Sequence, residues 1–93
     1  MILKVRITKE DIEDGVAGSC YWCPVARAIR RELKKLKDTR AGYLLTGVAV
    51  LCREVRVGEW AGNLPEEIAN FVIAFDTDRD SVKPISFELE IAA

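Results

Sequence analysis

Apolar and charged residues alternate at both ends of this chain, and this alternation constrains the fold more than any other feature. Residues 2–8 (ILKVRIT) place Leu3, Val5 and Ile7 on one face and Lys4 and Arg6 on the other. Residues 82–91 (VKPISFELEI) likewise alternate, with four large apolar side chains on one face, Ile85, Phe87, Leu89 and Ile91, and with Ser86, Glu88 and Glu90 on the other. Such period-two alternation is typical of a half-buried strand. Because Lys4 and Arg6 would face outward from one strand and Glu88 and Glu90 from the other, we expect the two strands to be neighbours.

Two segments between these strands have the pattern of amphipathic helices that begin at a proline. Residues 24–37 carry apolar side chains at helical spacing, and residues 64–75 (LPEEIANFVIAF) repeat this pattern with two glutamates in the first turn. Proline suits the first helical position, because the N–H that it lacks would have no partner there. A shorter helix is expected after Thr8, a residue type that caps helices and is followed by an acid three positions later.

The remaining segments complete an α+β pattern. Residues 43–57 (YLLTGVAVLCREVRV) predict extended structure, either one long strand or two strands joined near Cys52 and Arg53, and residues 58–63 (GEWAGN) predict a turn. The element order favours a single small domain over residues 1–93. We expect a three- to four-stranded, mostly antiparallel sheet with two or three helices packed on one face.

Composition narrows the class of protein. With 49% hydrophobic and 31% charged residues, the 93-residue chain is typical of one globular domain. It has no apolar run of about 18 residues that could span a membrane, and residues 1–8 lack the features of a signal peptide. Three cysteines without an export signal favour a reducing cytoplasm.

Charge is unevenly distributed along the chain. Residues 20–40 hold seven basic and two acidic residues, a net charge of +5, whereas the whole chain has a net charge of −1. Such polarity suits an anionic partner or a second copy of the chain, although it also suits an ordinary solvated helix face. A sequence pI near 5.5 argues against nucleic acid. The residues that we expect to contact a ligand or partner are Tyr21, Trp22, Arg27, Arg30, Arg31 and Lys34.

Two cysteines at the start of the second helix allow a different chemistry. Cys20 and Cys23 form a C-x-x-C-P sequence, and a helix N-terminus can stabilise a thiolate or help to build a metal site. Zinc needs about four ligands, and Cys52 is the only other thiol in a chain without histidine. A pair of partly buried cysteines that only fixes the loop against the helix is the structural alternative.

No motif indicates catalysis. The chain lacks histidine, the most common general base, and no spacing singles out a pair of catalytic carboxylates. Residues 76–81 (DTDRDS) begin like a calcium-binding loop, but Ser81 stands where such a loop needs glycine and Phe87 where it needs glutamate. We therefore expect no catalytic residues.

The N-terminal half resembles a family of small proteins found mainly in bacteriophage and prophage genomes. The shared pattern is a strand followed by I-T-x-x-x-I-x-x-G and then C-x-x-C-P-[VI]-A-x-A-[IL]. It is matched by Ile7, Thr8, Ile12, Gly15, Cys20, Cys23, Pro24, Val25, Ala26, Ala28 and Ile29. The C-terminal half is similar in outline at Leu64, Pro65, Glu66, Phe75, Asp76, Pro84 and residues 87–89 (FEL). The resemblance brings no assigned activity; it implies a phage accessory protein in a host cytoplasm.

These observations give one leading hypothesis and one alternative. The leading hypothesis is a non-enzymatic binding module without a cofactor. It would bind a host protein or a small anionic ligand through the helix after the C-x-x-C-P sequence, and a homodimer would readily provide the groove. The alternative is a thiol or zinc protein that uses Cys20 and Cys23.

Overall fold

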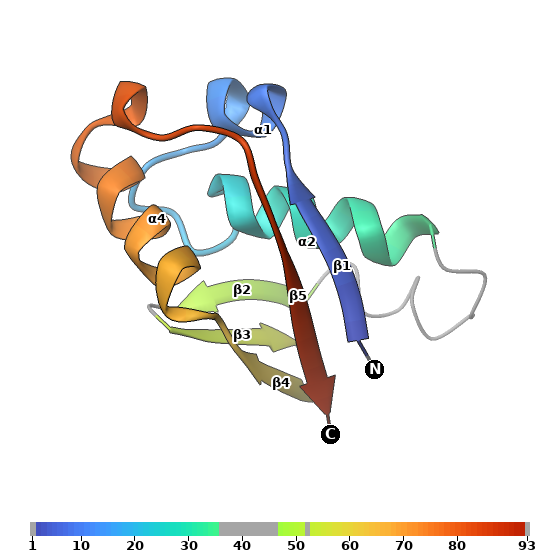
Figure 1. The fold of residues 1–93 in the computed structure, drawn as a ribbon. Helices are drawn as coiled ribbons and strands as arrows, with labels where there is room; N and C mark the ends of the chain where they lie inside the picture. The colour runs from blue at the N-terminus through green and yellow to red at the C-terminus, as the bar shows by residue number, and fades with distance from the viewer. Residues whose placement is uncertain (1, 36–46, 52, 93) are drawn as a thin grey trace.

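Five antiparallel strands in one curled sheet dominate the fold (Figure 1). The structure is a computed structural model that describes residues 2–35, 47–51 and 53–92. Their order along the chain is β1 (Ile2–Ile7), α1 (Lys9–Asp14), α2 (Pro24–Lys35), β2 (Val48–Leu51), β3 (Glu54–Val57), β4 (Trp60–Asn63), α4 (Glu66–Thr77), the short 3-10 helix η2 (Arg79–Ser81) and β5 (Ile85–Ala92). The strands are arranged in the order β1-β5-β4-β3-β2.

This architecture confirms the predicted α+β class and the pairing of the first and last strands. β1 and β5 are antiparallel, with Lys4 opposite Glu88 and Ile2 opposite Glu90. The sheet has one strand more than predicted, because part of the predicted turn at residues 58–63 is strand β4. The turn itself takes only residues 58 and 59. Gly58 has a φ of 60°, a conformation that suits glycine in a tight hairpin.

The helices begin where the sequence indicates. α1 has the expected capping box, in which the backbone N–H of Asp11 donates to Thr8 Oγ1 and the backbone N–H of Thr8 donates to Asp11 Oδ2. α2 begins at Pro24, and α4 begins one residue after Pro65. Residues 36 and 37, to which the second helix was predicted to extend, lie outside the described residues, as do Tyr43 and Cys52. No helix of the described segments is long and apolar enough to cross a membrane.

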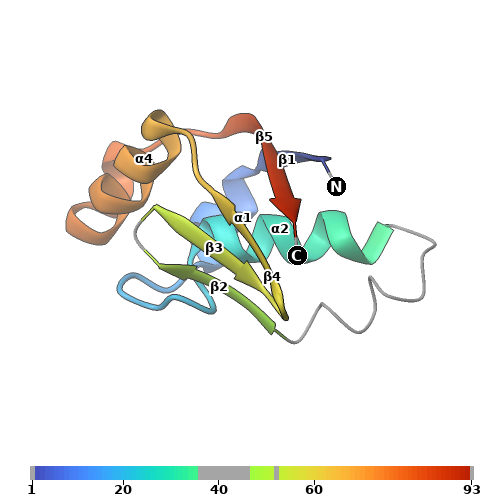
Figure 2. The same cartoon turned by 90° about the horizontal axis from the view of Figure 1, so that it is seen from below.

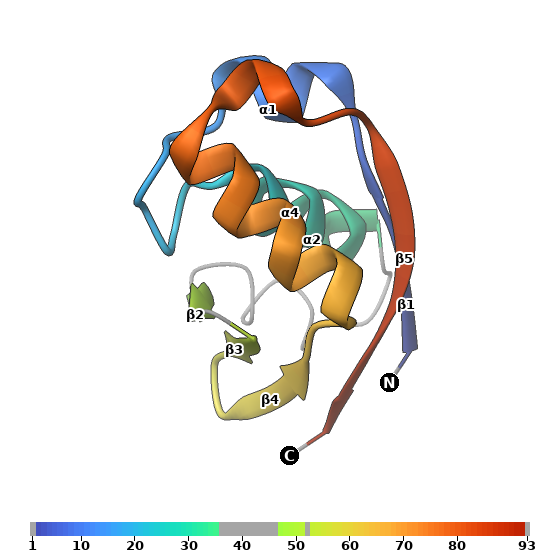
Figure 3. The same cartoon turned by 60° about the vertical axis from the view of Figure 1, so that its left-hand side comes forward.

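Helix α2 closes the curl of the sheet. It packs against both β1 and β2, the strands at the two ends of the strand order (Figure 2). Figure 3 shows α2 between the β1–β5 ribbon and strands β2–β4, with α4 in front of it. The core formed there contains the fully buried side chains of Ile7, Val25, Ile29, Leu33, Val48, Val57, Ile68, Phe75 and Leu89. Burial of this apolar surface is the main force that stabilises the domain.

Strand β5 joins the two parts of the sheet. Residues 85–90 pair with β1, and the last two residues, Ile91 and Ala92, pair with Gly62 and Ala61 of β4. The strands approach so closely at this junction that a Cβ atom on Gly62 would lie 2.4 Å from the carbonyl oxygen of Glu90 and 2.8 Å from Ile91 Cγ2. The β4–β5 junction therefore requires glycine at position 62.

Replacing that glycine tests this junction. We expect Gly62→Ala to lower the free energy of unfolding by roughly 1–3 kcal/mol, because the backbone must move to accept the methyl group. Chemical denaturation monitored by circular dichroism measures the change. Ser86→Ala, on an exposed position of β5, is the control and should change stability by less than about 0.5 kcal/mol. Equal stability of the Gly62→Ala variant and the parent would contradict the close approach.

Candidate functional site: a cationic hollow beside helix α2

The positive side chains of α2 gather around a hollow of about 490 Å³ on the surface. Its lining consists of Asp11, Trp22, Arg27, Arg30, Arg31 and Lys34. Five of the six residues predicted to contact a ligand are therefore brought together, and Tyr21 is the one that does not line it. Four cationic groups around a single carboxylate leave this hollow, which we call the cationic hollow, with an excess of positive charge.

Asp11 organises the inner side of the cationic hollow. It is the one fully buried charged residue among those that the structure describes. Both of its carboxylate oxygens accept hydrogen bonds of 2.8 Å from the guanidinium of Arg31, and its Oδ1 lies 3.7 Å from Arg27 Nε. Burial by itself would raise the pKa of the Asp11 carboxyl, but the bonds from Arg31 and Thr8 outweigh it and lower that pKa overall. Asp11 is thus held as a carboxylate.

Arg31 and Arg27 are engaged in holding elements together. Besides binding Asp11 on α1, Arg31 donates to the backbone carbonyl of Arg6 on β1, and its bonds to Asp11 raise its own pKa. Arg27 lies 3.6 Å from the carboxylate of Asp14, and its Nε atom is buried without a hydrogen-bond partner. These two guanidinium groups therefore contribute positive charge to the hollow, while most of their direct bonds join α2 to α1 and β1.

Arg30 fastens the loop of residues 15–23, which we call the cysteine loop, to the edge of the sheet. Its guanidinium lies over the Trp22 ring, 4.4 Å from the ring centroid, and donates to the carbonyls of Tyr21 and Val48, the latter at 3.3 Å. Burial lowers the pKa of Arg30, and the positive charge of Arg27 lowers it further, whereas Cys23 acts in the opposite direction. An anion in the hollow would relieve this repulsion between guanidinium groups.

Lys34 is the cation of the hollow that is most available to a ligand. It is exposed and makes no ion pair within residues 2–35, 47–51 and 53–92. The half-exposed Trp22 ring also lines this hollow. The cationic hollow therefore offers an exposed ammonium group, an aromatic surface and the positive field of three guanidinium groups, which together suit an anion.

Cys23 has a structural position at the start of α2. It is 3% exposed, and its Sγ atom accepts the backbone N–H of Ala26 at 3.4 Å, as a cap does for the first turn of a helix. Burial raises the pKa of its thiol despite the hydrogen bonds from Ala26 and Val25, so the thiolate is disfavoured near neutral pH.

Cys20 also helps to fix the loop that precedes α2. Like Cys23, it has a free thiol. It is partly buried, and its carbonyl accepts the N–H of Val50 at 2.8 Å, which ties the loop to β2. Within the described residues, no three side chains of histidine, cysteine, aspartate or glutamate are grouped so that they could hold a metal ion. The contacts of Cys20 and Cys23 thus tie the loop to β2 and to the first turn of α2, while the third cysteine, Cys52, lies outside the described residues.

Sequence reasoning found the cations but missed the carboxylate that organises them. Thr8 and the acid three residues later indicated that Asp11 caps α1, and that role is confirmed. Nothing in the spacing indicated that the same carboxylate binds an arginine 20 residues further along the chain. That contact depends on how α1 and α2 pack.

Comparisons with protein-family models, with curated proteins and with solved structures found no match to this chain. The resemblance to the bacteriophage family therefore stays a prediction.

Asp11→Asn tests the role of this carboxylate in stability. Removing one partner of a buried ion pair leaves the other partners without compensation, and we expect a loss of about 3 kcal/mol at neutral pH. Because the folded-state pKa of Asp11 is lowered, its contribution is fully present above the unfolded pKa of about 3.9 and is lost as pH falls towards the folded-state pKa. The difference between parent and variant should therefore shrink in acid.

Denaturation at several pH values provides the measurement. Asp80→Asn is the matched control, since Asp80 is an exposed carboxylate in η2, and we expect it to change stability by less than about 0.5 kcal/mol. A loss of stability in Asp11→Asn that is the same at acid and neutral pH would show that the charge of Asp11 is not what stabilises the fold.

Thiol alkylation tests the structural reading of the cysteines. Under reducing conditions, followed by removal of the reductant, we expect iodoacetamide to modify Cys20 at least about ten times faster than Cys23, because Cys23 is buried and its pKa is raised. Fragmentation mass spectrometry of the peptide that carries both residues resolves the two sites. Faster modification of Cys23 would instead indicate an activated thiol.

Proposed function

We propose that this protein is a non-enzymatic binding module that holds a small anionic ligand, bearing phosphate or carboxylate groups, in the cationic hollow. The observation that carries this proposal is the convergence of Trp22, Arg30 and Lys34, with the field of Arg27 and Arg31 behind them, on one hollow. Its volume of about 490 Å³ lies within the usual range of small-ligand sites, which favours a small anion over a large protein surface.

The local charge balance supports an anion in particular. Asp11 neutralises part of the guanidinium charge, but it is the one carboxylate among the residues that line the hollow, beside four cationic side chains. A ligand anion would bind the ammonium group of Lys34 in the positive field of the guanidinium groups, while the bonds that hold the fold stay in place. The exposed part of the Trp22 ring would lie beside a planar group of the ligand.

The biological setting of this proposal rests on the resemblance to bacteriophage proteins. On that basis we propose an accessory protein in the cytoplasm of a bacterial host, where sequestering a small anionic compound would be its action. A host protein with an acidic surface is the other partner that this charge distribution would accept.

Titration calorimetry with three probes tests the proposal: inorganic pyrophosphate, adenosine triphosphate and a poly-glutamate peptide. We expect the two phosphate compounds to bind, with affinity that falls as salt is added, and the triphosphate to be recovered unchanged. Lys34→Glu should weaken their binding at least about tenfold, because it replaces an attraction by a repulsion. Lys34 is preferred to Arg27 and Arg31 for this test because substitution of those arginines would also disturb Asp11.

Lys83→Glu is the matched control, because it makes the same change of charge at another exposed lysine. It should leave binding of the probes nearly unchanged. Absence of binding by both phosphate compounds, or equal losses in the two variants, would contradict a small-anion site. Binding of poly-glutamate alone would replace the small ligand by an acidic protein partner.

A further inference from the structure

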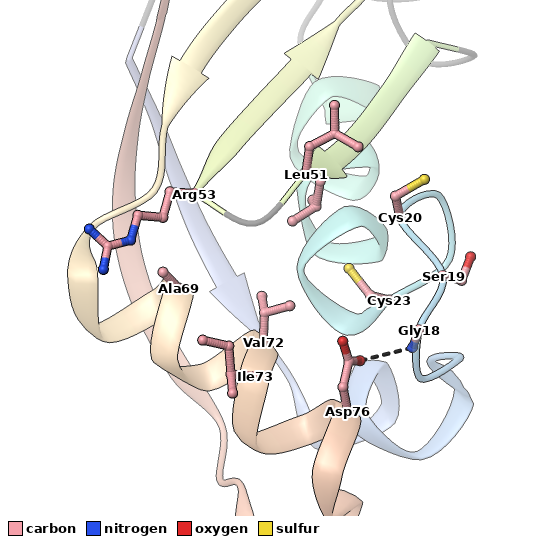
Figure 4. A pocket seen from close by; sticks show the side chains of 11 residues that line it. Gly18, Ser19, Cys20, Cys23, Leu51, Arg53, Ala69, Val72, Ile73 and Asp76 are labelled. Atoms are coloured by element: carbon pink, nitrogen blue, oxygen red, sulfur yellow. Dashed lines mark hydrogen bonds between the residues drawn. The ribbon is translucent and has the colours of Figure 1, made fainter.

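A second hollow, of about 540 Å³, lies between α4, the end of β2 and the loop that carries the cysteines (Figure 4). Its walls are mostly apolar: Val72 and Ile73 come from α4, Leu51 from β2 and Cys23 from the start of α2. We call it the apolar groove. It shares no lining residue with the cationic hollow, so its role is separate from the function proposed above.

Large apolar side chains are left exposed at the apolar groove. Ile73 is 65% exposed and Leu51 is 46% exposed, although both belong to regular elements of a small domain that buries most of its large aliphatic residues. Contiguous exposed apolar surface of this kind usually marks an interaction site. We therefore expect a binding partner to cover these two side chains.

Opposite charges stand at the two ends of the apolar groove. Figure 4 shows Arg53 near Ala69 at one end and Asp76 beside Gly18 at the other, with the apolar side chains of α4 between them. Asp76 Oδ1 accepts the N–H of Gly18 at 2.9 Å, and its other oxygen has no hydrogen bond to a described residue. Arg53 is exposed and makes no ion pair with any residue that the structure describes.

This arrangement is complementary to itself. A two-fold axis across the groove would bring the positive end of one copy to the negative end of the other, twice, while the apolar middles meet. We propose that the apolar groove is the interface of a homodimer, in which Ile73 of each subunit packs into the groove of the other and Arg53 pairs with the partner subunit's Asp76.

The dimer joins through side chains and not by extension of the sheet. The outer edge of β2, which borders the apolar groove, is already occupied by the chain itself: the N–H of Val50 donates to the Cys20 carbonyl, and the Val48 carbonyl accepts from Arg30. A second copy therefore finds few free backbone groups on β2 and meets an apolar surface with two charged ends.

Analytical ultracentrifugation over a wide concentration range, with a reductant present, tests this proposal. We expect a reversible dimer for the parent protein. Ile73→Asp should raise its dissociation constant at least about tenfold, because a charge would be buried in the interface. Ile2→Asp is a matched control, since Ile2 is 64% exposed but lies on β1; it should leave the dissociation constant unchanged.

A charge exchange provides the second, sharper test. Arg53→Asp and Asp76→Arg should each weaken the dimer about tenfold by placing like charges together, and the double variant should recover the parent affinity. Circular dichroism checks that each variant is folded. A parent that stays monomeric at every concentration, a dimer that tolerates Ile73→Asp, or a double variant without recovery would each overturn the proposal.

Discussion

Closure of the curled sheet by α2 is the constraint on which the rest of this structure depends. A five-stranded antiparallel sheet has two edges, and each edge exposes backbone groups that need partners or protection. α2 lies against both edge strands, and two adjacent arginines on it bind one carbonyl on each edge: Arg30 binds Val48 of β2, and Arg31 binds Arg6 of β1. The helix thereby joins the ends of the sheet that the hydrogen-bond ladder leaves apart.

Asp11 compensates the positive charges that α2 brings to this closure. Arg31 places a positive charge at the edge of β1, and Arg27 lies one turn before it on the same helix. A single carboxylate caps α1, accepts both donors of Arg31 and lies close to Arg27. One buried anion for several cations fixes the position of α1 and α2 but leaves an excess of positive charge on their outer side. The proposed binding site lies where this excess of positive charge is found. It is therefore a consequence of the ion pairs that hold α1 and α2 together.

The cysteine loop has an equally structural role. Its carbonyl at Cys20 occupies the outer edge of β2, Cys23 caps α2, and Trp22 lies under Arg30. This one short loop separates the cationic hollow on the side of Trp22 from the apolar groove on the side of Cys20 and Cys23. A change in the conformation of the loop would therefore alter the shape of both proposed sites.

The sequence by itself determined the α+β class, the starts of the helices, the capping box at Thr8 and the pairing of β1 with β5, because these follow from local patterns: apolar periodicity, proline and cap residues, and charges that alternate along one strand. It also indicated five of the residues that line the cationic hollow, since residues three and four apart on a helix are neighbours. It could not show that β4 is a strand, because Trp60–Asn63 is short and contains a glycine whose need for close packing against Glu90 exists only after β5 has come back beside it. Nor could it show that Arg31 binds both Asp11 and the edge of β1, whereas Arg30 binds the edge of β2. Tertiary structure alone decided these partners, because they depend on which distant carboxylates and carbonyl groups the packing of α1, β1 and β2 brings within reach of α2.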